Sequence, residues 1–138
     1  MTTLSDAFRR LGIYKVEIEN GGIYRIRDKA IAFPADDASG TRTKHEFRTV
    51  VVLSCNDICK DDNEQTVLVA PMSSDTTLKN TYDVKVRKSR ENGLNEDGRI
   101  IISHIQPILK EAFEKKIGVM PDWDWNVVVA HFVSAIDR

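Results

Sequence analysis

The sequence is poor in the features of exported, membrane-bound and disulfide-rich proteins. None of its apolar runs approaches the ~18 residues that a membrane span requires, and its start, MTTLSDAFRRLG, lacks the apolar core of a secretory signal. We therefore expect a cytoplasmic protein with no membrane association. Only two cysteines occur, Cys55 and Cys59. Their number and spacing fit neither a disulfide framework nor a zinc pattern, so we expect reduced structural thiols.

Several catalytic signatures are also missing. No glycine-rich phosphate loop, no G-x-G-x-x-G turn and no G-x-S-x-G nucleophile elbow occurs. The three histidines, His45, His104 and His131, are far apart and lack metal-ligand spacing. We therefore expect no metal and no cofactor. The acidic pairs Asp36-Asp37 and Asp61-Asp62 lie where turns are expected, so we interpret them as solvated loops.

The charge balance excludes a protein that coats nucleic acid through a global basic field. The formal net charge is −1, whereas non-specific phosphate binding grows with the number of cations engaged. Any nucleic-acid site must therefore be local. Taken singly, each basic cluster also fits a solvated strand or loop edge. Three such clusters occur: Arg25, Arg27 and Lys29; Arg42, Lys44, His45 and Arg48; and Lys85, Arg87, Lys88 and Arg90.

Two continuous β-branched runs mark the centre of a predicted sheet. Residues Arg48–Ser54 and Thr66–Ala70 have the length and composition of strands buried on both faces. We expect Pro71 to end the second run, because proline cannot donate to a strand ladder. Further strands are predicted at Tyr14–Ile18 and Ile23–Arg27, joined as a hairpin through Asn20-Gly21-Gly22, and at Tyr82–Val86 and Arg99–Ser103.

Apolar residues at helical spacing predict helices near both ends of the chain. We expect an amphipathic helix at Thr3–Leu11, a second from Pro107 to a terminator at Gly118, and a third after Pro121. The triplet Val127–Val129 in the last segment fits a strand equally well. With 138 residues, one core is expected, so residues 1–138 form a single domain. The fold class is mainly β (α+β): a compact antiparallel sheet or small barrel decorated by helices.

Three short blocks follow one another across the middle of the chain. Residues 22–26 read GIYRI, residues 48–54 read RTVVVLS, and residues 67–74 read VLVAPMSS. This order resembles the MazF/PemK toxins, which share a G-x-I-Y strand, a loop, an R-P-V-V-V-V-S strand and a strand ending in a Pro-x-Ser/Thr-Ser turn. The resemblance covers about residues 20–110, which leaves about 119–138 as a C-terminal extension.

The resemblance implies an SH3-like barrel of about five to seven antiparallel strands and a homodimer. It also implies metal-independent cleavage of single-stranded RNA, chiefly messenger RNA, which blocks translation and growth. A cognate antitoxin of a type II toxin-antitoxin system would bind across the same groove. In that family, the arginine that opens the second strand and the hydroxyl residue after the third are catalytic, which implies Arg48 and Ser73 here.

The residue types suit this chemistry. Without a metal, the neighbouring 2′-hydroxyl of RNA is the nucleophile, so the enzyme must align the backbone and neutralise developing phosphoryl charge. The Arg48 guanidinium offers planar donors that match phosphate oxygens, and the Ser73 hydroxyl can contact the same phosphate. His104 is a third catalytic candidate, as general base or acid, near where some family members place an acidic residue. Its ordinary alternatives are capping a strand or a hydrogen bond from the ring to the backbone.

The long segment Asp28–Phe47 has little periodicity and is either a functional loop or a flexible insertion. We predict RNA contacts from its Arg42, Lys44 and His45, and from Arg25 and Ser74. Two other functions stay open. One is a toxin that binds DNA gyrase through its C-terminal helix, where Trp123, Trp125 and Phe132 are either interface anchors or core residues. The other is an inactive interaction module.

Overall fold

The computed structural model describes residues 16–138, and the helix predicted at Thr3–Leu11 lies outside them. A seven-stranded, fully antiparallel sheet dominates the described part, with strand order β4-β5-β3-β2-β1-β7 and β6 paired separately to β3. The predicted mainly β, α+β class is confirmed. The strands are β1 (Gly22–Arg27), β2 (Phe47–Val52), β3 (Thr66–Ser73), β4 (Val84–Val86), β5 (Gly98–Ile100), β6 (Gln106–Leu109) and β7 (Phe113–Val119).

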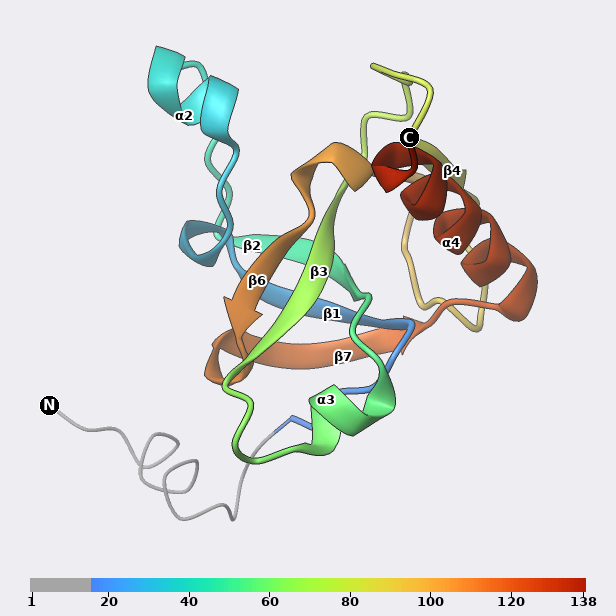
Figure 1. Cartoon of the computed structure of the whole chain (residues 1–138). Helices are drawn as coiled ribbons and strands as arrows, with labels where there is room; N and C mark the ends of the chain where they lie inside the picture. The colour runs from blue at the N-terminus through green and yellow to red at the C-terminus, as the bar shows by residue number, and fades with distance from the viewer. Residues whose placement is uncertain (1–15) are drawn as a thin grey trace, which may run out of the picture.

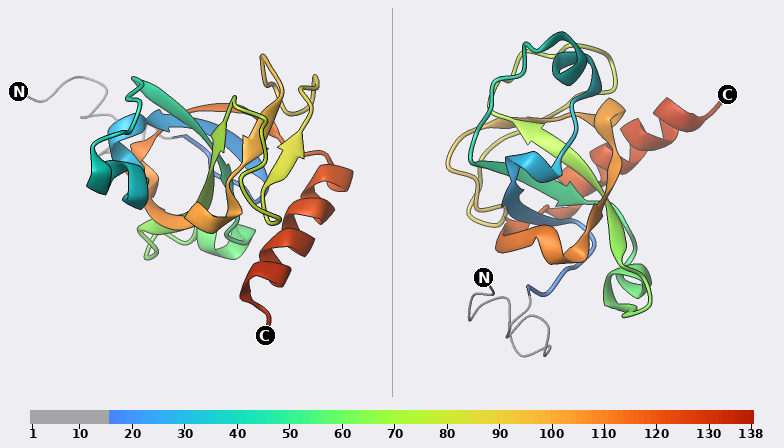
Figure 2. Two further views of the ribbon diagram at one scale, coloured as in Figure 1. Left: turned by 90° about the horizontal axis from the view of Figure 1, so that it is seen from above. Right: turned by 90° about the vertical axis from the view of Figure 1, so that its left-hand side faces the viewer.

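Three α-helices lie around this described sheet: α2 (Pro34–Ser39), α3 (Asn56–Lys60) and α4 (Asp122–Ile136). Helices α2 and α3 lie at opposite ends of the strands, and α4 runs along one side (Figures 1 and 2). Short 3₁₀ turns occur at Asp28–Ala30, Ile102–His104 and Lys110–Ala112. None of the described helices is long and apolar enough to cross a membrane.

The central strands bury both of their faces, as their β-branched composition predicts. Alternate residues enter two core clusters: Tyr24 and Val50 belong to one, and Ile23 and Val51 to the other. The curled sheet wraps around the first cluster, where the Tyr24 and Phe113 rings meet edge to face with centroids 5.1 Å apart. Burial raises the pKa of Tyr24 to about 12, and its hydroxyl donates to the Glu17 carbonyl at 2.7 Å.

The predicted N-terminal hairpin is wrong in the part that can be compared. Residues 16–19 form no strand, and β1 pairs instead with β2 and β7. The Asn20-Gly21 turn does form, with Gly21 at φ 75°, but it leads into β1 and does not join two paired strands. Its Asn20 side chain donates to the carbonyls of Leu53 and Ser54. The turn therefore ties the start of β1 to the end of β2.

Strand β3 continues through Pro71 to Ser73, so the prediction that Pro71 ends it is wrong. Proline loses only its N–H donor and keeps its carbonyl. That carbonyl accepts the Ile101 N–H at 2.9 Å. At this point β3 also changes its partner: its first residues pair with β6, and its last two pair with β5. The extra length of β3 carries Ser73 to the end of the sheet, beside the loops.

The predicted helix from Pro107 to Gly118 is also wrong, because this stretch forms β6, a 3₁₀ turn and β7. Its apolar spacing fits a helix, but β1 has a free edge that β7 fills by pairing along most of its length. Gly118 does not end a helix: a Cβ there would lie 2.4 Å from the Asn92 backbone. Close backbone approach is the reason for this glycine.

The C-terminal segment is a helix, α4, and residues Val127–Val129 belong to it. Val128 is fully buried, and Trp125 and Phe132 pack against the second core cluster. Trp123, by contrast, is 78% exposed. The predicted strand Arg99–Ser103 is shorter than expected, because β5 ends at Ile100 and a 3₁₀ turn follows. The segment Asp28–Phe47 contains a 3₁₀ turn and α2.

Candidate functional site

A cavity of about 590 Å³ opens where β2 and β3 meet the loops at one end of the sheet. The segments 33–45, 73–83 and 101–104 and the start of β5 line it. All three predicted catalytic residues, Arg48, Ser73 and His104, lie in its wall. Of the predicted RNA-contacting residues, it contains Arg42, His45 and Ser74. The fold thus brings together residues that are far apart in the sequence.

Asp28, which sequence reasoning missed, fixes the orientation of Arg48. Its carboxylate is buried, and Oδ1 accepts a hydrogen bond from Arg48 Nε at 2.7 Å. Arg48 Nη2 donates to the Thr43 carbonyl at 3.1 Å. The guanidinium is therefore held at two of its three nitrogens. The position of Asp28 at the end of a largely buried strand was a usable signal, because buried charged residues are usually paired.

Arg42 shares the same carboxylate. Its Nη2 lies 2.7 Å from Asp28 Oδ1, and its Nη1 lies 3.1 Å from Asp37 Oδ1. Burial works to raise the pKa of Asp28, but hydrogen bonds from Arg48 and Arg42 outweigh it and hold that pKa below its ordinary value. Asp28 is therefore ionised at neutral pH and keeps both guanidinium groups in place.

Phe33 forms an apolar platform beneath the same groups. The guanidinium carbons of Arg42 and Arg48 lie 4.8 and 4.7 Å from its ring centroid. The His104 ring meets it edge to face, with centroids 5.5 Å apart. Cation–π attraction of this kind is strongest where water is displaced. One aromatic ring thus positions three of the polar side chains of the cavity.

Ser73 and His104 each retain hydrogen-bonding capacity. Ser73 Oγ accepts the Asp75 N–H at 3.2 Å, which leaves its own hydroxyl proton free to donate. His104 Nδ1 is buried and has no hydrogen-bond partner within residues 16–138. The ordinary alternative for His104, a backbone hydrogen bond from the ring, is not formed at this nitrogen. The Ser73 hydroxyl is therefore free to donate to a ligand, and His104 lines the same cavity with its Nδ1 buried.

Two predicted RNA-contacting residues lie outside the cavity wall. Arg25 is on the opposite side of the sheet, where its guanidinium lies 4.2 Å from the Phe47 ring centroid. It faces Thr49 on β2 and Lys115 on β7. Lys44 is exposed on the loop beyond Arg42. The structure therefore separates these two side chains from Arg48 and Ser73.

A second ion pair in the cavity wall was also missed from the sequence. Arg99 Nη1 donates to Asp83 Oδ2 at 3.1 Å, and the two side chains are 8% and 0% exposed. Asp83 Oδ2 also accepts the Lys79 N–H at 2.9 Å. Arg99 opens the apolar run of β5 much as Arg48 opens that of β2, and this similarity was the available signal.

A smaller hollow of about 180 Å³ adjoins the main cavity and shares Ser73 and Ser74 with it. Its floor includes Met72, Leu94 and Ile117. Within residues 16–138, no group of three or more histidine, cysteine, aspartate or glutamate side chains could hold a metal ion. What the site offers a ligand is oriented guanidinium, hydroxyl and imidazole groups. Such donors suit a phosphate ester.

Comparisons with known proteins identify the family of this chain. A family model described as PemK-like, MazF-like toxin of type II toxin-antitoxin system matches residues 31–135, a range that includes all of α4 except its last residue. No curated protein matches the sequence significantly.

Solved structures share the fold at low sequence identity. The Mycobacterium tuberculosis toxin MazF-mt6 aligns with a TM-score of 0.62 at 18% identity, over 84% of this chain and 96% of the other. MazF from Deinococcus radiodurans gives 0.64 at 12% identity, over 90% and 100%. An endoribonuclease in complex with its cognate antitoxin from a mycobacterial species gives 0.58 at 12% identity, over 87% and 93%. With the family model spanning most of its length, this chain belongs to the PemK-like, MazF-like toxins of type II toxin-antitoxin systems.

Proposed function

We propose that this toxin is a metal-independent endoribonuclease that cleaves single-stranded RNA in the cavity between Arg48, Ser73 and His104. The observation that carries the proposal is the fixed guanidinium of Arg48, held at Nε by Asp28 and at Nη2 by Thr43 beside the Ser73 hydroxyl. Preorganised donors of this kind stabilise charge that develops in a transition state, because they need no reorganisation when the reaction occurs.

The reaction would proceed by attack of a ribose 2′-oxygen on the adjacent phosphorus. A bond from the 2′-oxygen to phosphorus forms, and the bond from phosphorus to the 5′-oxygen breaks. The 2′-hydroxyl proton leaves to a base, and the departing 5′-oxygen accepts a proton. Arg48 and Ser73 would bind the phosphoryl oxygens, and the imidazole of His104 in the cavity wall would make one of the proton transfers.

The test is incubation of the purified protein with a long single-stranded RNA in EDTA. We expect cleavage by the wild type and a loss of about 10²–10³-fold in Arg48→Ala, the cost typical of removing one preorganised donor. Arg90→Ala is the matched control, because Arg90 is exposed and lies outside both hollows. An RNA with 2′-deoxyribose at the cleaved nucleotide should resist. Intact RNA, or equal cleavage by Arg48→Ala, would refute the proposal.

We also propose that the toxin acts in the cytoplasm as a homodimer and is neutralised by a cognate antitoxin that covers the cavity. Related structures include a mycobacterial endoribonuclease with its antitoxin and MazE–MazF complexes from Deinococcus radiodurans. Light scattering on the purified chain tests the dimer. Protection of RNA by the product of a neighbouring reading frame tests the antitoxin.

A second candidate, a toxin that binds gyrase through α4, is favoured only by the exposed apolar residues of that helix. Trp123 is 78% exposed and Ile136 is 66% exposed. Deleting α4 would be a poor test, because Val128 and Trp125 belong to the core. Substituting Trp123 and Ile136 with serine leaves the core intact. Toxicity that is lost in this variant and retained in Arg48→Ala would favour gyrase binding.

A further inference from the structure

Beside Arg42 and Arg48, the cavity wall contains a third arginine, Arg99, which the family pattern does not include. Antiparallel register places Arg99 of β5 directly opposite Ser73 of β3. Directly opposed residues have Cβ atoms about 4.5–5.5 Å apart and point to the same side of the sheet. Arg99 and Ser73 therefore face the cavity together, and both line it.

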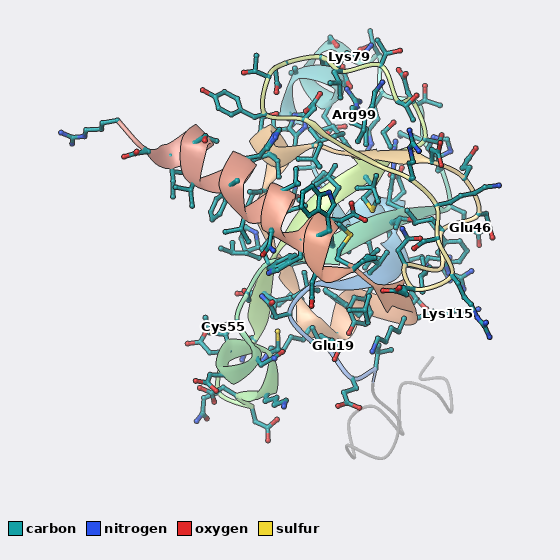
Figure 3. All side chains as sticks on the ribbon, turned by 90° about the vertical axis from the view of Figure 1, so that its right-hand side faces the viewer. Glu19, Glu46, Cys55, Lys79, Arg99 and Lys115 are labelled. Carbon is teal, nitrogen blue, oxygen red and sulfur yellow. The ribbon has the colours of Figure 1, made fainter. Side chains whose placement is uncertain are left out.

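Arg48 lies on the other side of Ser73. Strand β3 is between β2 and β5 in the sheet. The β2–β3 pairing ends at Val50, which is opposite Pro71, and Arg48 lies two residues before Val50 on β2. Arg48, Ser73 and Arg99 all line the same cavity. Figure 3 shows Arg99 beside Lys79 at the end of the molecule opposite Cys55 and Glu19.

Arg99 is held rigidly while some of its donors stay unused. Its Nη1 binds Asp83 Oδ2 and the Thr77 carbonyl, each at 3.1 Å. Its Nε is buried without a partner in the described chain, as is Asp83 Oδ1. A buried donor that lacks a partner is costly. Of the two atoms, only Arg99 Nε is a donor, and a phosphate oxygen is an acceptor of the kind that it lacks.

We propose that Arg99 binds a backbone phosphate of single-stranded RNA beside Ser73, with Asp83 as its positioning residue. This inference rests on the proposed function and adds Arg99 to Arg42 and Arg48 as a contact for RNA. With Arg48 and Arg99 on either side of Ser73, the two guanidinium groups engage either neighbouring phosphates or two oxygens of one phosphate. Because both arginines are paired with carboxylates, each guanidinium is held in a fixed direction toward the phosphate.

The principal variant keeps the fold while removing the pair. Replacing Arg99 alone leaves Asp83 buried and unpaired, which endangers folding. The double variant Asp83→Leu with Arg99→Met removes both charges at similar volume, a change that buried ion pairs often tolerate. Arg99→Lys keeps the charge but loses the planar fork. Arg90→Gln serves as the control for loss of one exposed positive charge. Circular dichroism and thermal melting establish folding of every variant.

Binding and cleavage are then measured separately. Binding uses a short fluorescent 2′-O-methyl RNA, which cannot be cleaved, over a range of salt concentrations. We expect the double variant to lose about 0.7 from the slope of log affinity against log salt, the value for one phosphate contact on a single strand. Arg99→Lys should retain the slope but lose about tenfold in kcat. Arg90→Gln should match the wild type in both.

Asp83→Asn isolates the positioning role. We expect Arg99 to keep its charge but lose its fixed direction, so kcat should fall about tenfold while the salt slope stays that of the wild type. A purely structural ion pair would lower the melting temperature and leave kcat unchanged in the folded fraction. That outcome would overturn the positioning role.

The outcomes separate this inference from the proposed function. If a folded double variant binds with the wild-type salt slope and cleaves at the wild-type rate, Arg99 is structural and the inference is overturned, while ribonuclease activity stands. If the wild type leaves RNA intact, the proposed function fails. In that case the salt slope of 2′-O-methyl RNA binding still decides whether Arg99 contacts phosphate.

Discussion

Two buried aspartates hold the two arginines beside Ser73, and they differ in how many partners they have. Asp28 binds Arg48 and Arg42 through Oδ1 and the His45 N–H through Oδ2. Asp83 binds Arg99 and the Lys79 N–H through Oδ2 alone, and its Oδ1 has no partner within residues 16–138. The first carboxylate has both oxygens engaged, whereas the second uses only one.

This difference indicates that the two arginines are held to different degrees. Arg48 is held by Asp28 and also lies over Phe33, so its direction is determined twice. No ring contact is found for Arg99 in the described chain, and the loop 74–83 that carries its carboxylate has little regular structure. The Arg48 guanidinium therefore presents its remaining N–H donors in one fixed direction. The Arg99 side is held through Nη1 alone and leaves Arg99 Nε without a partner within residues 16–138.

The largest expected effect is on stability, and it comes from Asp28→Asn. Two guanidinium groups would lose their carboxylate, so we expect a loss of about 3–5 kcal/mol in the free energy of unfolding. Asp83→Asn should cost less, because one ion pair is affected. Urea denaturation of both variants measures the difference. Equal losses would contradict the distinction between the two carboxylates.

The dependence of stability on pH should also reveal the contribution of Asp28. Hydrogen bonds from Arg48 and Arg42 hold the folded pKa of Asp28 below its unfolded value of about 3.9. The contribution of Asp28 is therefore fully present above pH 4 and is lost as the pH falls through its folded pKa. We expect wild-type stability to drop steeply below about pH 4. Asp28→Asn should flatten that slope. An unchanged slope in the variant would exclude Asp28 as its source.

Much of the sheet was predictable from local pattern. The β-branched runs at β2 and β3 and the aromatic stripe of α4 gave their correct types, because buried strands and amphipathic helices have distinct periodicity. The secondary structure of residues 107–118 was not predictable in this way, because their apolar residues fit the spacing of a helix as well as that of a strand. These residues form strands because β7 pairs with the edge of β1, which is distant in the sequence.

The site was predictable only through the ordered family blocks. They identified Arg48 and Ser73, which the fold places in one cavity. Asp28, Asp83 and Arg99 were missed, because each acts through a partner 16–20 residues away. A buried ion pair leaves no spacing signature: its two residues need only meet in space. Long-range pairing of this kind requires the structure.

A smaller effect on RNA cleavage is expected from one of two phenylalanines that each lie under two arginines. Phe33 lies under Arg42 and Arg48 in the cavity, and Phe47 lies under Arg25 and Arg27 on the opposite side of the sheet. Replacement by leucine removes cation–π contacts worth about 0.5–1 kcal/mol each in either case, so stability should change similarly. Only Phe33→Leu frees a guanidinium that faces Ser73.

We therefore expect Phe33→Leu to lower kcat for RNA cleavage about tenfold, since small errors in donor placement are costly in a preorganised site. Phe47→Leu should stay within about twofold of the wild type, because surface changes away from a site have small effects. Single-turnover cleavage with melting curves on both variants makes the measurement. A similar loss of rate in the two variants would mean that RNA also depends on the Arg25 side of the sheet, as the basic cluster around Arg25 predicts.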